Sequence, residues 1–517
     1  MIVGLNQYNT EMKMHNHSSK ILLLTIILTI LSLYSWGCVP KKQVDFTVQN
    51  IQWKPQNPLE GDFVTFSITI ANIGSADSSA LNPIDITLYI DGKNFAVNNV
   101  PPMSAGKSET VVLLSEWQAV SKCHEIKVIV NGNDKVKEPD KDNNTKAKEL
   151  CVENRLLWKQ ILIDSSKIYS SPALNKGNIF VASGNNVLYC LNSESGNLVW
   201  EKSVGVDFHN SSMDTLFSSP VVSEGKVYIH AYDRDNKGQL NAYLLCLSAD
   251  KGNLSWKQLV FTWPSSFDSL PYSGSSPAIY NGKVYLISEI YFYCFNATNG
   301  KLVWKYKTNS PIDSSPAFYQ GKVYTSLQGS DYLGCFDAES GKLLWKHRTG
   351  ETLSTQSYIL ANNGKLYVCP AADVIYCLNA ENGDLLWEKD ISSIADAGSP
   401  LYTPPEIYNN KLYVGLRNNT LFCLNANDGE LLWQCKTMSD KYKVNDPPSS
   451  PVEVDNGKLY FGSSLGTLYC LDADKGTLLF SYKTQEEEKI WSKPLIYQGK
   501  VYFGAGDKVY CISTNSN

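Results

Sequence analysis

The sequence predicts an all-β protein with two domains, a β-sandwich followed by an eight-bladed β-propeller. Aromatic residues make up 11% of the chain, with 30 Tyr and 12 Trp, and such side chains favour strands. Apolar and polar residues alternate in the N-terminal part, as in half-buried strands. A short segment then recurs through the remainder. At 517 residues the chain is too long for one ordinary domain.

The recurring segment is typified by Cys377-Leu-Asn-Ala-Glu-Asn-Gly-Asp-Leu-Leu-Trp387. A cysteine ends a short apolar strand, glycine follows in a polar turn, and an aromatic residue stands ten positions after the cysteine. The pairs are Cys190/Trp200, Cys246/Trp256, Cys294/Trp304, Cys335/Trp345, Cys377/Trp387, Cys423/Trp433 and Cys470/Phe480. This constant spacing indicates a rigid structural joint.

Each repeat contains four predicted strands, and the repeat length of 41 to 56 residues is typical of a propeller. A Ser-Ser-Pro signal precedes the first strand, and Gly-Lys-Val-Tyr marks the second. The last copy ends at Cys511 without a fourth strand, whereas Trp158 lies in a fourth-strand pattern without preceding partners. We therefore expect the strand near Trp158 to complete the last blade of a propeller spanning 156–517, which leaves no open sheet edge.

The repeated cysteines are predicted to be small buried side chains beneath the docking aromatic residues. Equivalent positions in neighbouring blades are about 10 Å apart, which is too far for disulfides or a shared metal ion. Phe480 replaces tryptophan in the seventh copy. We infer that the joint needs a large aromatic ring, without any need for the indole N–H.

Residues 45–152 are predicted to form the β-sandwich. Apolar residues alternate at Phe66, Ile68 and Ile70, and similar alternation occurs in 84–90 and 126–130. Turn signals such as Asp91-Gly92 separate these runs. About seven strands of this kind are typical of an immunoglobulin-like sandwich.

Both domains resemble known families. Residues 45–152 resemble the CARDB family of cell-surface modules in Asn72-Ile-Gly74, Asp91-Gly92 and Asp142-Asn143-Asn144. The turn-plus-tryptophan repeat resembles the docking motif of quinoprotein (PQQ-type) propellers. Lipid-anchored propellers of this kind in the BamB family act as scaffolds in outer-membrane protein assembly. These resemblances imply a cell-surface or envelope role.

Cys123 opens the penultimate predicted strand of the sandwich and Cys151 closes the last one. A hairpin centred near Lys137 would place them side by side, so a disulfide is expected in an exported chain; two free thiols are the alternative. The intervening loop 138–144 is rich in carboxylates and amides. We expect a solvated acidic turn there, with a calcium site as the alternative.

The N-terminus has the pattern of an export signal, with an apolar run at 21–33. We assign 1–37 to a signal peptide or membrane anchor and 38–44 to a tether. Gly37-Cys38 resembles the lipobox of bacterial-type lipoproteins, which implies lipid attachment at Cys38, although Ser35 and Trp36 depart from the usual pattern. An uncleaved anchor and an ordinary secreted protein are the alternatives. All three place the rest of the chain outside the cytoplasm.

Catalytic motifs are missing from the sequence. It has no Cys-Cys pair of the kind that covers the quinone in quinoprotein alcohol dehydrogenases, no Cys-x-x-Cys-His haem motif, and none of the common hydrolase or phosphate-loop signatures. Its six histidines are scattered. We therefore expect no enzymatic activity, no cofactor and no metal ion, with a PQQ-dependent dehydrogenase as the alternative.

The loops between blades are the expected site of function. Connections from each fourth strand to the next first strand emerge on one face of a propeller, and loops vary there without disturbing the ring. They carry aromatic residues of the type that anchors interfaces, namely Phe208, Trp263, Phe267, Tyr272, Tyr442 and Trp491. The alternative is a purely structural role, in which each aromatic residue packs under its own loop.

The sequence thus predicts an exported, membrane-tethered and non-catalytic scaffold. Its expected partner is a protein or polysaccharide of the cell envelope, bound through the loop face of a monomer. The net charge of −5 argues against nucleic acid. An outer-membrane assembly factor of BamB type is the second alternative.

Overall fold

A computed structural model describes residues 41–78, 84–205, 218–263, 275–308, 315–327, 332–349, 358–369, 374–392, 403–416, 419–439 and 444–514. These residues form strands and one short 3-10 helix, η1 (Asp142–Asn144). Contacts divide the chain into two compact units. The first comprises Met1–Lys54, Thr65–Glu116 and Cys123–Leu150, and the second comprises Pro55–Val64, Trp117–Lys122 and Cys151–Asn517.

Two antiparallel sheets form the N-terminal sandwich-like domain. One has the order β1-β2-β5 with β6 paired to β2, and the other has the order β4-β3-β7-β8. Side chains alternate as predicted, and Phe66, Ile68 and Ile70 of β2 are fully buried. The strands are β1 (Phe46–Lys54), β2 (Phe63–Asn72), β3 (Ile84–Ile90), β4 (Lys93–Val100), β5 (Ser108–Val112), β6 (Trp117–Gln118), β7 (Lys122–Val130) and β8 (Thr145–Val152).

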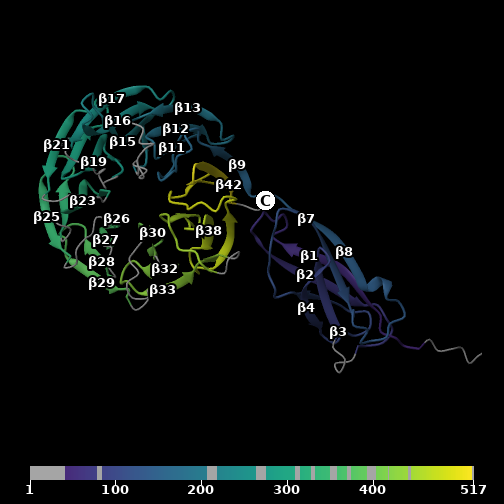
Figure 1. The fold of residues 1–517 in the computed structure, drawn as a ribbon. Coiled ribbons are helices and arrows are strands. Elements are labelled where there is room, and N and C mark those ends of the chain that lie inside the picture. The colour runs from purple at the N-terminus through teal and green to yellow at the C-terminus, as the bar shows by residue number, and fades with distance from the viewer. Residues whose placement is uncertain are drawn as a thin grey trace, which may run out of the picture. The chain divides into compact units, whose positions relative to one another are not determined.

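Eight four-stranded antiparallel sheets follow within the described residues, consistent with a propeller. Figure 1 shows these sheets arranged around a common centre, with fourth strands such as β21, β25 and β29 on the outer rim. Blades 1 to 4 comprise β10 (Ala173–Asn175), β11 (Asn178–Ala182), β12 (Val187–Asn192), β13 (Leu198–Ser203); β14 (Val221–Ser223), β15 (Lys226–Arg234), β16 (Leu240–Ser248), β17 (Leu254–Thr262); β18 (Ala278–Tyr280), β19 (Lys283–Ser288), β20 (Tyr291–Asn296), β21 (Leu302–Lys307); and β22 (Ala317–Tyr319), β23 (Lys322–Leu327), β24 (Tyr332–Asp337), β25 (Leu343–Arg348).

The last blade is completed by a strand from the start of the domain. β9 (Leu156–Ile161) pairs antiparallel with β42, and Trp158 lies opposite Cys511. The expected closure is therefore present. Blades 5 to 8 comprise β26 (Tyr358–Asn362), β27 (Lys365–Cys369), β28 (Val374–Asn379), β29 (Leu385–Asp390); β30 (Glu406–Tyr408), β31 (Lys411–Gly415), β32 (Thr420–Asn425), β33 (Leu431–Lys436); β36 (Glu453–Asp455), β37 (Lys458–Gly462), β38 (Thr467–Asp472), β39 (Leu478–Lys483); and β40 (Leu495–Tyr497), β41 (Lys500–Ala505), β42 (Lys508–Ser513) with β9.

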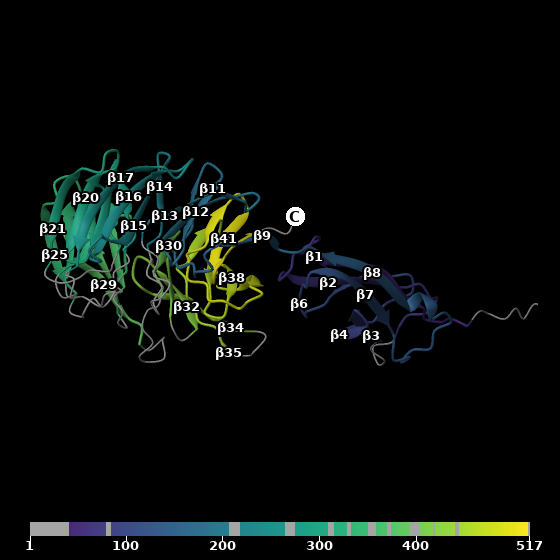
Figure 2. The ribbon, with the colours of Figure 1, turned by 45° about the horizontal axis from the view of Figure 1, so that its top comes forward.

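A small hairpin projects between blades 6 and 7. It consists of β34 (Met438–Ser439) and β35 (Val444–Asn445), which pair with one another only. Figure 2 shows it at the edge of the ring, below β32 and β38.

The repeated tryptophan docks on the turn glycine of the next blade. A Cβ atom on Gly341 would lie 2.5 Å from the ring of Trp304, and its φ of +69° suits glycine. Glycine is needed there for both reasons. The same contact joins Trp158 to Gly196, Trp200 to Gly252, Trp256 to Gly300, Trp345 to Gly383, Trp387 to Gly429 and Trp433 to Gly476.

The indole N–H also has a role, which corrects the inference drawn from Phe480. Trp256 Nε1 donates a hydrogen bond to the carbonyl of Ala297 (3.2 Å), and the Tyr228 hydroxyl donates to the same oxygen (3.0 Å). Trp158, Trp200, Trp304, Trp387 and Trp433 make the equivalent indole bond at 3.0–3.3 Å. The joint therefore combines ring packing with a partly buried hydrogen bond.

The repeated cysteines are free and buried, as predicted. Each lies directly opposite the aromatic residue of its own repeat, as Cys190 lies opposite Trp200. Burial raises the pKa of the Cys190 thiol to about 12. These thiols therefore pack as small apolar groups.

The seventh joint differs because its aromatic residue docks on a cation. The guanidinium of Arg155 lies 3.6 Å from the ring centroid of Phe480. Arg155 is 0% exposed; it donates to the carbonyls of Glu60 and Ser513 (both 2.8 Å) and pairs with the Asp62 carboxylate. All these residues belong to the second unit. At the other joints the turn of the next blade accepts the indole N–H. Here the first and last strands of the propeller meet instead, and Arg155 occupies the place of that turn, so phenylalanine fits.

Candidate binding face

The loop face carries the connections from each fourth strand to the next first strand. Phe208, Phe267, Tyr272 and Tyr442, four of the aromatic residues expected to form the binding face, lie outside the described residues. The structure places the other two, Trp263 and Trp491.

Trp263 is buried, which corrects its expected role as a surface anchor. It is 4% exposed and packs against Tyr232 and Phe261, with ring centroids 5.8 and 4.8 Å away. Its burial follows from the length of blade 2, because β15, β16 and β17 each have nine residues. The long apolar run at the end of β17 was the signal for this extra layer of core.

Trp491 remains at the surface, with 37% of its area exposed. The Lys489 ammonium stands 3.5 Å from its ring centroid, and the Tyr169 ring lies 6.0 Å away at a tilt of 57°. These residues come from the connections that enter blades 8 and 1. An aromatic residue beside a cation is the type of group enriched at protein interfaces.

A charged cluster lies on the first strands, which surround the centre of the ring in Figure 1. Lys493, at the entry to β40, pairs with Glu406 of β30 and Glu453 of β36, each at 2.6 Å. Burial lowers the pKa of Lys493, but the two carboxylates outweigh it and the net shift is upward. Burial raises the pKa of Glu453. The cluster carries a net charge of about −1 at neutral pH.

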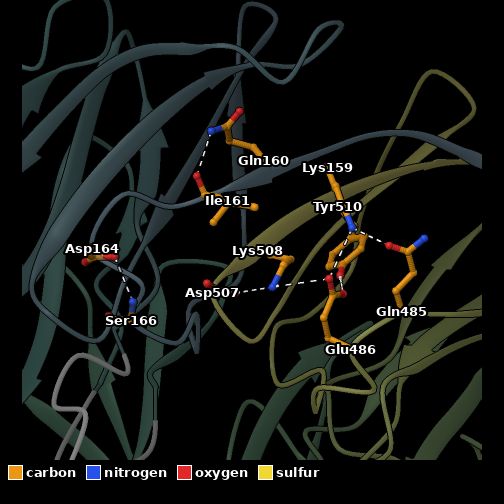
Figure 3. A network of polar contacts seen from close by, with 10 residues as sticks. All are labelled: Lys159, Gln160, Ile161, Asp164, Ser166, Gln485, Glu486, Asp507, Lys508 and Tyr510. Carbon is orange, nitrogen blue, oxygen red and sulfur yellow. Dashed lines mark hydrogen bonds and ion pairs between the residues drawn. The ribbon is translucent and has the colours of Figure 1, made fainter.

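A second polar network fixes the connection into blade 8 to the closing strands (Figure 3). The Glu486 carboxylate accepts a hydrogen bond from Tyr510 (2.6 Å) and pairs with Lys159 (3.4 Å) and Lys508 (3.7 Å). The Tyr510 hydroxyl is the main cause that lowers the pKa of Glu486. The network ties β9, β42 and this connection together, so it holds the loop beneath Trp491 in place.

The three described histidines lie on separate strands. His124 bonds to Asp91 (2.9 Å) in the N-terminal domain, whereas His230 and His347 belong to β15 and β25. Burial raises the pKa of the Cys369 and Cys435 thiols as well. The raised pKa values favour the protonated thiols over the nucleophilic thiolates.

Cys123 and Cys151 are both disulfide-bonded. In the neighbouring loop, Glu138 accepts hydrogen bonds from the backbone of Phe46 (2.5 Å) and the side chain of Asn144 (3.0 Å). This carboxylate therefore fastens the loop to β1. Cys38, the expected lipid attachment site, lies outside the described residues. No helix among the described residues is long and apolar enough to cross a membrane.

Comparisons with known proteins agree with the two-part architecture. A family model described as outer membrane protein assembly factor BamB matches residues 151–290, 241–359, 290–445 and 440–516, well over half of the chain. A CARDB family model matches residues 43–148. No curated protein matches the chain in sequence.

Solved structures share the propeller fold at low identity. BamB from Moraxella catarrhalis is 12% identical with a TM-score of 0.50, and the match covers 69% of this chain and 99% of that chain. Quinohemoprotein alcohol dehydrogenase from Comamonas testosteroni is 13% identical with a TM-score of 0.52, covering 69% and 76%. The computationally designed Ika8 protein is 13% identical with a TM-score of 0.52, covering 69% and 99%.

The Lys493 cluster offers no free cation to a pyrroloquinoline quinone. That cofactor carries three carboxylates and needs cationic partners. Lys493 is the ammonium of the central cluster, and Glu406 and Glu453 already neutralise it. A further anion there would face a net negative cluster. We therefore derive no chemistry through a quinone.

Proposed function

Because the chain belongs to the BamB family of propeller-repeat proteins and carries an N-terminal CARDB domain, we propose that it is a membrane-tethered, extracytoplasmic scaffold. It binds an envelope protein through the loop face and catalyses no reaction. The tether is the N-terminal segment with a lipid on Cys38. The propeller supplies a rigid ring, and its connections supply the recognition surface.

Trp491 is the observation that carries this proposal. It is the one expected anchor that the structure both describes and leaves exposed. The Glu486 network holds its connection in place, so little conformational entropy is lost when a partner binds. Lys489 lies over the indole ring, which leaves less of the ring for stacking on a sugar. This arrangement favours a protein partner over a polysaccharide.

Site-specific photocrosslinking in the native envelope tests the proposal. A photoreactive phenylalanine analogue is placed at position 491 or, as a control, at Leu344 on the outer rim, which is 44% exposed. We expect a discrete protein adduct from position 491 and none from position 344. Equal adducts from both positions, or none from either, would refute the proposal. If position 491 gives no protein adduct and Trp491→Ala loses binding to a saccharide, the face recognises a glycan instead of a protein.

The family match favours one specific partner class, the outer-membrane assembly machinery. Co-purification of that machinery with the wild type, and its loss in Trp491→Ala, would assign this role. The alternative enzyme reading is tested by dye-linked alcohol oxidation with added calcium and quinone. Turnover above a heat-denatured control would overturn the non-catalytic assignment.

A further inference from the structure

One sheet of the N-terminal domain places two cysteines and a carboxylate on an exposed face. Cys123 lies near the start of β7, and Glu149 and Cys151 lie near the end of β8. These strands are hydrogen-bonded neighbours, and β8 stands last in the strand order of its sheet. Glu149 and Cys151 are two residues apart, so their side chains leave the strand on the same side. The alternate residues Leu150 and Val152 are buried.

Three possible ligand atoms converge on this face. The sulfurs of Cys123 and Cys151 and a carboxylate oxygen of Glu149 all lie within 4.8 Å of one another. Two thiolates on a tetrahedral Zn²⁺ are about 3.8 Å apart, because each Zn–S bond is about 2.3 Å long. All three side chains are exposed, so they can rotate into this geometry. The group therefore has the composition and spacing of a zinc site with three protein ligands.

The redox state of the sulfurs decides whether a metal ion binds. Cys123 and Cys151 are disulfide-bonded, and the sulfur species that binds a metal ion is the thiolate. Exposed disulfides are the ones most readily reduced by thiol exchange. The repeated cysteines of the propeller are buried, which protects them from such exchange. The exposed pair is therefore the place where the described chain meets a reductant or an oxidant.

We propose that Cys123, Cys151 and Glu149 form a redox-gated site for a thiophilic divalent cation, namely Zn²⁺. A dithiol reductant opens the disulfide by transferring two electrons and two protons, and becomes a disulfide itself. Zn²⁺ then replaces the two thiol protons and binds both sulfurs, the Glu149 oxygen and one water molecule. Exchange with an oxidised dithiol reforms the S–S bond, because the oxidant takes the two electrons together with two protons from solvent, and the ion is released.

The charge of Glu149 favours the metal-bound state of the reduced site. Two thiolates and a carboxylate carry three negative charges, and like charges this close destabilise one another. A divalent cation removes most of this repulsion, so the carboxylate disfavours the metal-free dithiolate and stabilises the zinc complex. The disulfide and the zinc complex both join β7 to β8. The sheet therefore keeps a tie between these strands under oxidising and reducing conditions.

Cobalt substitution in the full chain tests the proposal, because Co²⁺ takes the place of Zn²⁺ and absorbs light when thiolates bind it. The chain is reduced with a phosphine, which supplies no competing sulfur ligand. We expect the reduced chain to bind Co²⁺ with thiolate charge-transfer absorption that Zn²⁺ abolishes, and the oxidised chain to show none. Glu149→Gln should weaken binding at least about tenfold, since even the outer-shell partners of zinc ligands contribute that much. Glu125→Gln, which removes another exposed carboxylate of β7, should leave the affinity unchanged.

Alkylation of the reduced wild type gives a second readout that needs no variant. Zn²⁺ should slow the reaction of Cys123 and Cys151 with iodoacetamide, as measured by mass spectrometry of their peptides. Cys435 is only partly buried, so it serves as the internal control and should react at the same rate with and without Zn²⁺.

Four results would overturn the proposal. The first is a reduced wild type without thiolate-to-cobalt absorption. The second is absorption that persists in the double variant Cys123→Ser/Cys151→Ser, because the thiolates would then come from elsewhere in the chain. The third is equal affinity of Glu149→Gln and Glu125→Gln. The fourth is protection of Cys435 by Zn²⁺ to the same extent as the pair.

Discussion

Removing the charge of Arg155 should destabilise the ring at its closing point. The guanidinium is fully buried, and it satisfies two backbone carbonyls and the Asp62 carboxylate. Burial lowers the pKa of Arg155, and the charge of Asp62 opposes that shift. In Arg155→Met, the apolar chain still covers Phe480, but the Asp62 carboxylate loses its cation.

The expected cost is about 3–5 kcal/mol, the range for breaking one side of a buried ion pair. Asp62 keeps the amide N–H of Leu59 at 2.8 Å as a donor, which favours the lower part of this range. The double variant Arg155→Met/Asp62→Leu should recover most of the loss, because both buried charges leave together. Lys322→Met breaks the exposed pair with Glu381 and should cost less than about 1 kcal/mol.

Urea unfolding followed by tryptophan fluorescence measures these differences for the transition of the propeller. The decisive quantity is the coupling between positions 155 and 62 in the double-mutant cycle. A cost for Arg155→Met no greater than that of Lys322→Met would refute the assignment of a buried ionic clasp. A double variant as unstable as the sum of its single variants would refute the pairing with Asp62.

Three further outcomes follow from the joints and the closing network. Trp433→Phe should cost about 1 kcal/mol more than Trp345→Phe in urea unfolding, because Nε1 of Trp345 has no hydrogen-bond partner among the described residues, whereas Trp433 donates at 3.2 Å; equal costs would contradict this. Gly341→Ala should cost more than Gly321→Ala by several kcal/mol, because both glycines have positive φ but a Cβ meets a neighbour only at Gly341; similar midpoints would count against the docking contact. The pKa of Glu486 is lowered in the folded state, so its contribution to stability is full above the unfolded pKa near 4.3 and is lost as pH falls through the folded pKa. The difference in unfolding free energy between wild type and Glu486→Gln, at most about 1 kcal/mol at pH 7, should therefore disappear in acid. A difference that grows in acid would contradict the direction of the shift.

Much of the fold could be predicted because each repeat carries the same joint-forming residues. The constant distance from Cys377 to Trp387 predicts one turn and one docking aromatic ring, and both recur in all seven copies. The unpaired pattern at Trp158 likewise predicted the closing strand, because a ring without an open edge needs one more strand. These features depend on local spacing, which a single sequence displays.

Features that depend on contacts between distant segments were harder to predict. The repeat spacing does not predict the extra layer of core around Trp263, and the apolar end of β17 was the one local signal for it. The clasp at Arg155 joins residues from three parts of the chain. Its signal was the departure of the seventh repeat, where Phe480 replaces tryptophan because its docking partner is a cation instead of a turn.

The direction of the joints has an evolutionary consequence. Each tryptophan reaches only the next repeat, so every ordinary joint is encoded within two consecutive repeats. Duplication or deletion of a whole repeat in the gene therefore leaves each tryptophan facing an equivalent turn glycine. The Arg155 clasp has no such redundancy, because it occurs once and draws on residues from both sides of the ring opening. Gain and loss of blades should consequently spare the closing point and accumulate in the interior repeats.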